Sequence, residues 1–117
     1  MGQWKKFKKI SPRAAAMTAS IYKGGRLSIT KAVFDTIGSQ FIELYYNNER
    51  NAIGISASNK TSDDALELRN PARQTSWIVS IKAFLSYYKI SEDVEGKRYN
   101  VNEEDGMLVI DLNKPTT

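Results

Sequence analysis

Residues 18–57 read TASIYKGGRLSITKAVFDTIGSQFIELYYNNERNAIGISA, and this stretch decides the fold. The pair Gly24 and Gly25 separates two short runs in which apolar residues alternate with polar ones. Two glycines between alternating runs favour a tight β-hairpin turn, because glycine adopts the positive φ angles that such turns need. The beginning of the stretch therefore predicts a β-hairpin.

A helix and a second hairpin are expected to follow. Thr30 can cap a short helix over residues 31–37, and Gly38 can end it in the left-handed conformation. Residues 40–46 and 52–57 then alternate again, on either side of a polar turn. The stretch thus predicts the order hairpin, helix, hairpin.

The same order of elements recurs in the second half, in segments 65–69, 75–79, 81–88, 97–101 and 107–112. The dipeptide Lys-Ala stands near both helix starts, at Lys31 and at Lys82. Repeated units usually cannot bury their apolar faces alone. We therefore expect the α+β fold class, β-rich, with two tandem hairpin–helix–hairpin units at residues 18–58 and 64–114 related by a pseudo-two-fold axis.

The positive charge is concentrated at the N-terminus. The chain of 117 residues holds 17 Lys or Arg and 13 Asp or Glu, and residues 1–31 contain eight of the basic residues and no acidic one. Such an asymmetry indicates a polyanionic partner: nucleic acid, anionic lipid or an acidic protein surface. A solvated arm that only aids solubility is the alternative. We interpret residues 1–17 as a basic N-terminal arm and residues 18–117 as a single domain.

The chain contains neither Cys nor His. This composition excludes disulfides, thiolate nucleophiles, Ser-His-Asp triads and imidazole metal sites. The acidic clusters, at Asp63-Asp64 and Glu103-Glu104-Asp105, are interpreted as solvated turn charge. We therefore expect a protein that is not an enzyme, with no catalytic residue, no metal ligand and no cofactor.

No apolar run approaches the roughly 20 residues that a membrane-spanning helix needs. No signal-peptide core follows the basic start either. We expect the protein to lie in the cytoplasm, either of its own cell or of a host.

Residues 25–32, the helix that ends at Gly38 and the hairpin over residues 41–55 together resemble the βαββ unit of AbrB-like regulators. MraZ-type members of that family carry two such units in one chain. The resemblance implies a swapped-hairpin β-barrel that binds DNA through basic residues around the first hairpin, and it leaves a homodimer open. The matching positions are Arg26, Lys31, Arg73 and Lys82.

Most of the chain also looks like small bacterial and phage-type proteins. The shared features are a Leu-Tyr-Tyr hairpin strand at residues 44–46, a Lys-Ala-Phe-Leu helix at residues 82–85 and a closing strand at residues 106–112. This second resemblance implies a fold and no activity.

The segment WKKFKKI at residues 4–10 interleaves aromatic and basic side chains. Lysines neutralise phosphates and release counterions, while aromatic rings stack on bases. Alternatively, Trp4, Phe7 and Ile10 form one helical stripe that docks on the body of the protein or on an anionic membrane surface. The candidate nucleic-acid-binding residues are Trp4, Lys5, Lys6, Phe7, Lys8, Lys9, Arg13, Lys23, Arg26 and Lys31.

Some tyrosines could form a platform on which nucleic-acid bases stack, but packing within the protein is the stronger interpretation of their side chains. These tyrosines are Tyr45, Tyr46, Tyr87, Tyr88 and Tyr99. Adjacent strand residues face opposite sides, so at most one of Tyr45 and Tyr46 can face a ligand.

The favoured function is a small, regulator-like nucleic-acid-binding protein, with DNA as the preferred ligand. It would use the basic arm and the first hairpin. The alternative is a non-enzymatic protein-interaction module, such as a phage-type factor that inhibits or adapts a host complex through an exposed sheet edge or apolar patch. A structural protein of a small symmetric assembly is the third interpretation.

Overall fold

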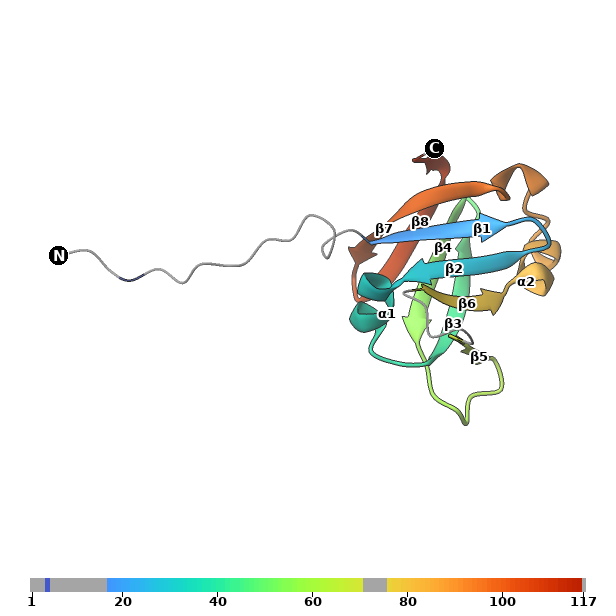
Figure 1. Cartoon of the computed structure of the whole chain (residues 1–117). Coiled ribbons are helices and arrows are strands. Elements are labelled where there is room, and N and C mark those ends of the chain that lie inside the picture. Colours follow the sequence, from blue (N-terminus) through green and yellow to red (C-terminus); the bar gives the residue numbers. More distant parts are fainter. Residues whose placement is uncertain (1–3, 5–16, 71–75, 117) are drawn as a thin grey trace.

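The structure is a computed structural model that describes residue 4 and residues 17–70 and 76–116. In these residues eight strands form one antiparallel sheet that curls into a nearly closed barrel (Figure 1). The strands are β1 (Thr18–Tyr22), β2 (Arg26–Thr30), β3 (Phe41–Asn47), β4 (Ala52–Ala57), β5 (Leu66–Glu67), β6 (Ser76–Ser80), β7 (Lys97–Glu104) and β8 (Met107–Pro115). The helical segments are α1 (Lys31–Ile37), α2 (Lys82–Tyr87) and the 3-10 helix η1 (Glu92–Val94).

The strand order around the barrel is β5-β3-β4-β8-β7-β1-β2-β6. The two ends of this order meet where Arg69, just after β5, pairs with Ile78 of β6. The backbone N–H of Arg69 donates to the carbonyl of Ile78 at 2.9 Å, and that of Ile78 donates to the carbonyl of Arg69 at 2.8 Å. Closure of this kind removes most of the unpaired edge of a sheet.

The predicted α+β class with two tandem hairpin–helix–hairpin units is wrong. Within the described residues α1 is the only helix with as many as seven residues, and the sheet dominates the fold. The β7–β8 hairpin lies between β1 and β4 and joins the two earlier hairpins into one sheet, and no clear internal repeat is visible. The prediction failed because β1 pairs with β7, β2 with β6 and β4 with β8, across the proposed unit boundary.

Several local predictions are confirmed. Helix α1 ends at Gly38, whose φ of 72° is left-handed and whose N–H donates to the carbonyl of Phe34. The turn between β7 and β8 contains Asp105 and Gly106, both with positive φ. Helix α2 differs from expectation at its start, because Ile81 rather than Ser80 occupies the N-cap position and makes no side-chain capping bond.

The core fills the barrel interior, where every second residue of each strand points inward. The largest fully buried side chains include Ile21, Leu27, Ile29, Ile42, Ile53, Ile55, Tyr99 and Ile110. Strands β2 and β6 are antiparallel neighbours, and each leads into a helix. Helices α1 and α2 therefore close opposite ends of the barrel, with Val33 and Leu85 as their buried residues (Figure 1).

Tyr99 provides a test of the core. Its ring is fully buried, its hydroxyl donates to the carbonyl of Val94 at 2.8 Å, and burial raises its pKa. Tyr99→Phe leaves that carbonyl without its partner, so we expect a loss of about 1–2 kcal/mol in the free energy of unfolding, measured by urea denaturation. Tyr45→Phe is the matched control, since Tyr45 is exposed, and should change stability by less than about 0.5 kcal/mol. Equal losses in the two variants would contradict this assignment.

Candidate nucleic-acid interface

A row of outward-facing side chains crosses the barrel wall from β7 to the segment after β5. Consecutive residues of the row are direct cross-strand partners, which project to the same side of a sheet. The row runs Arg98, Ser20, Ser28, Ile78, Arg69. Its chain neighbours in the strands, such as Ile21 and Leu27, are buried inside the barrel. An arginine thus stands at each end of a row whose middle positions include two serines.

A second row lies beside the first, two residues further along β1. It contains Tyr22, Arg26 and Ser80, which are again direct partners. Lys23 follows Tyr22 in the hairpin turn. Tyr22 is 51% exposed, and Lys23 and Arg26 are exposed as well. We call the surface formed by Tyr22, Lys23, Arg26, Arg69 and Arg98 the cationic face.

Most of the positive charge on the cationic face lacks an ion-pair partner. In the part of the chain that the structure describes, the ion pairs are Lys31–Asp35 at 2.7 Å, Arg50–Glu104 at 2.9 Å and Arg69–Glu67 at 3.5 Å. Lys23, Arg26 and Arg98 belong to none of them. Exposed pairs such as Arg69–Glu67 are weak and exchange readily with other ligands. The face can therefore offer its guanidinium groups to an external anion.

The tip of the β1–β2 hairpin is flanked by two hollows. One, of about 440 Å³, lies toward β6 and is lined by three basic residues and one acidic residue, among others: Lys23, Arg26, Arg69 and Glu67. The other, of about 230 Å³, lies toward β7 and is lined by Ser20, Tyr22, Lys97 and Arg98 together with neighbouring residues. Ser20 is half-buried and Ser28 is buried, so the surface between Arg98 and Ile78 is low. An elongated ligand could therefore follow the surface on either side of the tip.

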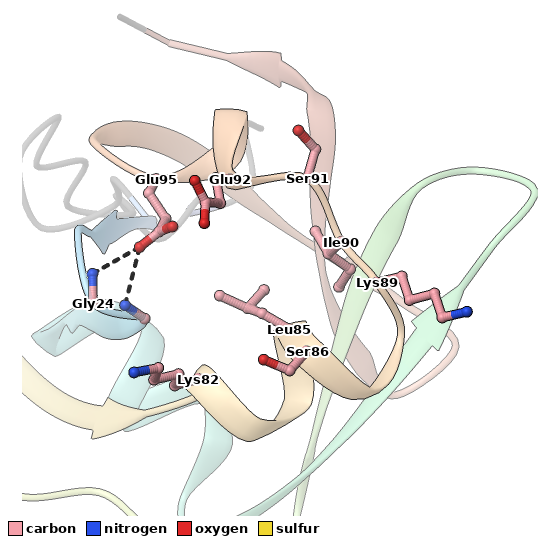
Figure 2. Close-up of a pocket in the computed structure, with 10 residues that line it drawn as sticks. Gly24, Lys82, Leu85, Ser86, Lys89, Ile90, Ser91, Glu92 and Glu95 are labelled. Carbon is pink, nitrogen blue, oxygen red and sulfur yellow. Dashed lines mark hydrogen bonds between the residues drawn. The ribbon is translucent and has the colours of Figure 1, made fainter.

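The hairpin turn that presents these residues is held in place by Glu95. One carboxylate oxygen of Glu95 accepts hydrogen bonds from the N–H groups of Gly24 and Gly25, at 2.7 and 3.1 Å (Figure 2). Both glycines have positive φ, 93° and 80°. On its other side, Gly25 approaches α2 so closely that a Cβ atom there would lie 2.7 Å from the Cα of Lys82. The turn is thus fixed both to η1 and to α2.

The structure places the predicted binding residues in different regions. Lys23 and Arg26 belong to the cationic face. Lys31 lies on α1, at the end of the barrel opposite α2, and pairs with Asp35. Trp4 is fully exposed. The remaining predicted residues, together with the family-matched Arg73, lie outside the described residues: Lys5, Lys6, Phe7, Lys8, Lys9 and Arg13.

Sequence reasoning missed three members of the cationic face: Tyr22, Arg69 and Arg98. Alternation along β7 could show that Arg98 points away from the core, because its neighbour Tyr99 is apolar. It could not show that β7 lies beside β1. The pairing of Ser20 with Arg98 is a property of the sheet, and no local pattern encodes it.

The tyrosines considered as a base-stacking platform lie in different parts of the barrel. Tyr99 is buried, and Tyr45 is exposed on the outer side of β3. Tyr46, Tyr87 and Tyr88 come together with Phe84 at the α2 end of the barrel.

One of the two acidic turn clusters is not merely solvated, because Glu104 pairs with Arg50 of the β3–β4 turn. Glu104 accepts two hydrogen bonds from Arg50, and these bonds lower the pKa of the Glu104 carboxyl. Among the described residues, no group of three or more carboxylates is arranged to hold a metal ion. Nor does that part of the chain contain a helix with the length and apolar character needed to cross a membrane.

No family model matches the chain, and no curated protein or solved structure matches it either. The AbrB-like resemblance therefore stays a prediction.

Proposed function

We propose that the protein binds nucleic acid, with DNA as the favoured ligand, through the cationic face and the basic N-terminal arm. The observation that carries this proposal is the row with Arg98 and Arg69 at its ends and Ser20, Ser28 and Ile78 between them. Its five positions span four strand spacings, roughly 19 Å along the sheet. That length covers several phosphates of one strand, since they repeat every 3.4 Å or so along a duplex.

The chemistry of the row suits a phosphate backbone. Arginine binds phosphate oxygens with two parallel hydrogen bonds, and serine hydroxyls and backbone groups supply further bonds of the kind that position a protein on nucleic acid. Ser20 and Ser28 are too small to obstruct a backbone lying between the arginines. Tyr22, beside the row, offers an aromatic ring to a base or a sugar.

The basic N-terminal arm adds positive charge that is next to the cationic face in the chain, because it leads directly into β1. Residues 1–17 carry five basic side chains and are followed directly by β1, the strand that bears Ser20 and Tyr22. Two cationic segments joined covalently can engage one polyanion together, which raises affinity through effective concentration.

The alternative function, a protein-interaction module that uses a sheet edge, has one candidate edge among the described residues. Strands β5 and β6 are the ends of the strand order, and the bridge between Arg69 and Ile78 brings them together. Strand β5 pairs only with Phe41 and Ile42, so the described residues provide no partner strand on that side of β3 from Glu43 to Asn47.

A salt series tests the proposal. The full chain is titrated into a labelled DNA oligonucleotide of about 16 nucleotides, and the dissociation constant is measured by fluorescence anisotropy. We expect affinity to fall by about 100-fold or more between about 50 and 200 mM salt, because bound cations release counterions from phosphates. Changing Lys5, Lys6, Lys8 and Lys9 to alanine should make the salt dependence shallower. Undetectable binding at the lowest salt concentration would overturn the proposal.

A further inference from the structure

An exposed group of four aromatic rings stands at the α2 end of the barrel. Phe84, Tyr87 and Tyr88 come from α2 and its C-cap, and Tyr46 comes from the end of β3. The ring centroids of Tyr46 and Tyr88 are 5.2 Å apart, those of Phe84 and Tyr88 5.1 Å, and those of Tyr87 and Tyr88 4.9 Å. We call these four residues the aromatic cluster.

Exposure rises from the inside of the aromatic cluster to its outside. Tyr46 and Phe84 are half-buried, and the hydroxyl of Tyr46 donates to the side-chain oxygen of Asn51 at 2.7 Å. Tyr88 is 42% exposed and Tyr87 is 78% exposed. Tyr87 meets Tyr88 at an interplanar angle of 81°, so the two rings pack edge to face and not face to face. The inner rings are thus fixed by packing, while Tyr87 presents a rigidly backed ring to solvent.

Helix α2 with its C-cap carries three residues of the aromatic cluster and also lines a hollow beside the β1–β2 turn. This hollow of about 340 Å³ lies beside the contact between α2 and the β1–β2 turn, and it is lined by Gly24 and Gly25 on one side and by Lys82, Ser86 and Lys89 on the other (Figure 2). In Figure 2, the amino group of Lys82 lies on the turn side, and that of Lys89 points away at the far end of the helix. Both lysines are exposed and belong to none of the ion pairs within the described residues.

One wall of this hollow is acidic. Glu92 and Glu95 line it opposite α2, and Glu95 is engaged by the turn. Carboxylates repel phosphates, so a nucleic acid leaving the cationic face is favoured along the lysine side. Tyr87 and Tyr88 lie between Ser86 and Lys89 in the chain but do not line the hollow, so they face another side of α2.

We infer that the aromatic cluster binds unpaired bases, and that the protein therefore prefers single-stranded nucleic acid to duplex. The inference rests on the proposed function. Lys82 and Lys89 supply charge complementarity to a phosphate backbone, and every base offers a face that can stack on Tyr87. In a duplex those faces are occupied by neighbouring base pairs, so a duplex can use the cationic face but not the aromatic cluster.

The test compares one labelled DNA strand of about 16 nucleotides with the duplex of the same sequence, using the full chain at one salt concentration. We expect the single strand to bind about 10-fold more tightly. Tyr87→Ala should lower the affinity for the single strand about 10-fold and so remove most of that difference. It should change the affinity for the duplex less than about twofold. Tyr87→Phe keeps the ring and should bind as the unchanged protein does.

The control variant is Tyr45→Ala, which removes another exposed tyrosine that makes no ring contact with the aromatic cluster. It should leave both affinities unchanged. If the two probes bind equally and Tyr87→Ala alters neither, the inference is overturned while nucleic-acid binding stands. If neither probe binds at low salt, the proposed function itself fails. Capture of a protein partner that depends on Tyr87, with no preference for the single strand, also overturns the inference.

Discussion

If the protein binds DNA as proposed, the double variant Arg26→Glu, Arg98→Glu is expected to lose DNA affinity by at least about 100-fold. The two arginines lie on β2 and β7, on either side of β1, and both are exposed and outside every ion pair of the described residues. In the proposed complex, each substitution would remove charge-assisted hydrogen bonds to phosphate, worth about 1.5–3 kcal/mol, and would add a repulsive carboxylate. Two such losses in one site correspond to about 100-fold or more in the dissociation constant, measured by anisotropy at low salt.

The matched control is Arg50→Glu, Lys60→Glu, which changes the net charge by the same amount. Arg50 follows β3 and Lys60 follows β4, away from the cationic face. The DNA affinity of this control should fall by a few-fold at most, because the substitutions change only the long-range electrostatic potential of the protein. Arg26→Glu, Arg98→Glu should melt within a few degrees of the unchanged protein, because both positions are exposed and outside the ion pairs of the described residues. The control also loses the exposed Arg50–Glu104 ion pair, so both variants are compared at a temperature where each is fully folded. Equal losses of affinity in the two variants would show that net charge, and not the cationic face, holds the DNA.

Local structure was predictable where a turn or helix end needs a backbone conformation that few residue types adopt. Gly38 ends α1 because it adopts positive φ without strain, and Asp105-Gly106 forms the β7–β8 turn for a similar reason. The alternation of apolar residues in β4 gave its bounds correctly. These signals act over a few residues, and a sequence displays them directly.

The arrangement of the strands was not predictable in this way. A side-chain period of two residues tells which side of a strand is buried, but it does not tell which strand lies next to it. The two Lys-Ala dipeptides do stand at the starts of α1 and α2. The helices nevertheless close opposite ends of one barrel, and the second hairpin of the second half completes the sheet of the first half.

The same limit applies to the candidate site. Lys23 and Arg26 could be selected because they are close in sequence, at one hairpin. Lys31 was included for the same reason, although the chain turns into α1 at that point and carries it to the other end of the barrel. Arg69 and Arg98 enter the cationic face only through strand pairing with β6 and β1.

Gly25→Ala is expected to destabilise the fold by about 3 kcal/mol. The backbone at Gly25 has a φ of 80°, which costs an alanine roughly 1 kcal/mol. The added Cβ would also lie 2.7 Å from the Cα and 3.0 Å from the backbone nitrogen of Lys82, and these backbone atoms cannot rotate away. Forcing the turn and α2 apart adds about 1–3 kcal/mol of overpacking. Urea denaturation measures the difference in the free energy of unfolding.

Gly24→Ala separates these two causes. Gly24 has a φ of 93°, but an added Cβ there meets no atom within 4 Å, so its substitution should cost only the conformational part, about 1 kcal/mol. Because the turn carries Lys23 and leads into Arg26, the displacement caused by Gly25→Ala should also weaken DNA binding in the fraction that remains folded. Gly24→Ala should bind normally. Equal stability of the two variants would mean that the turn and α2 are not in contact.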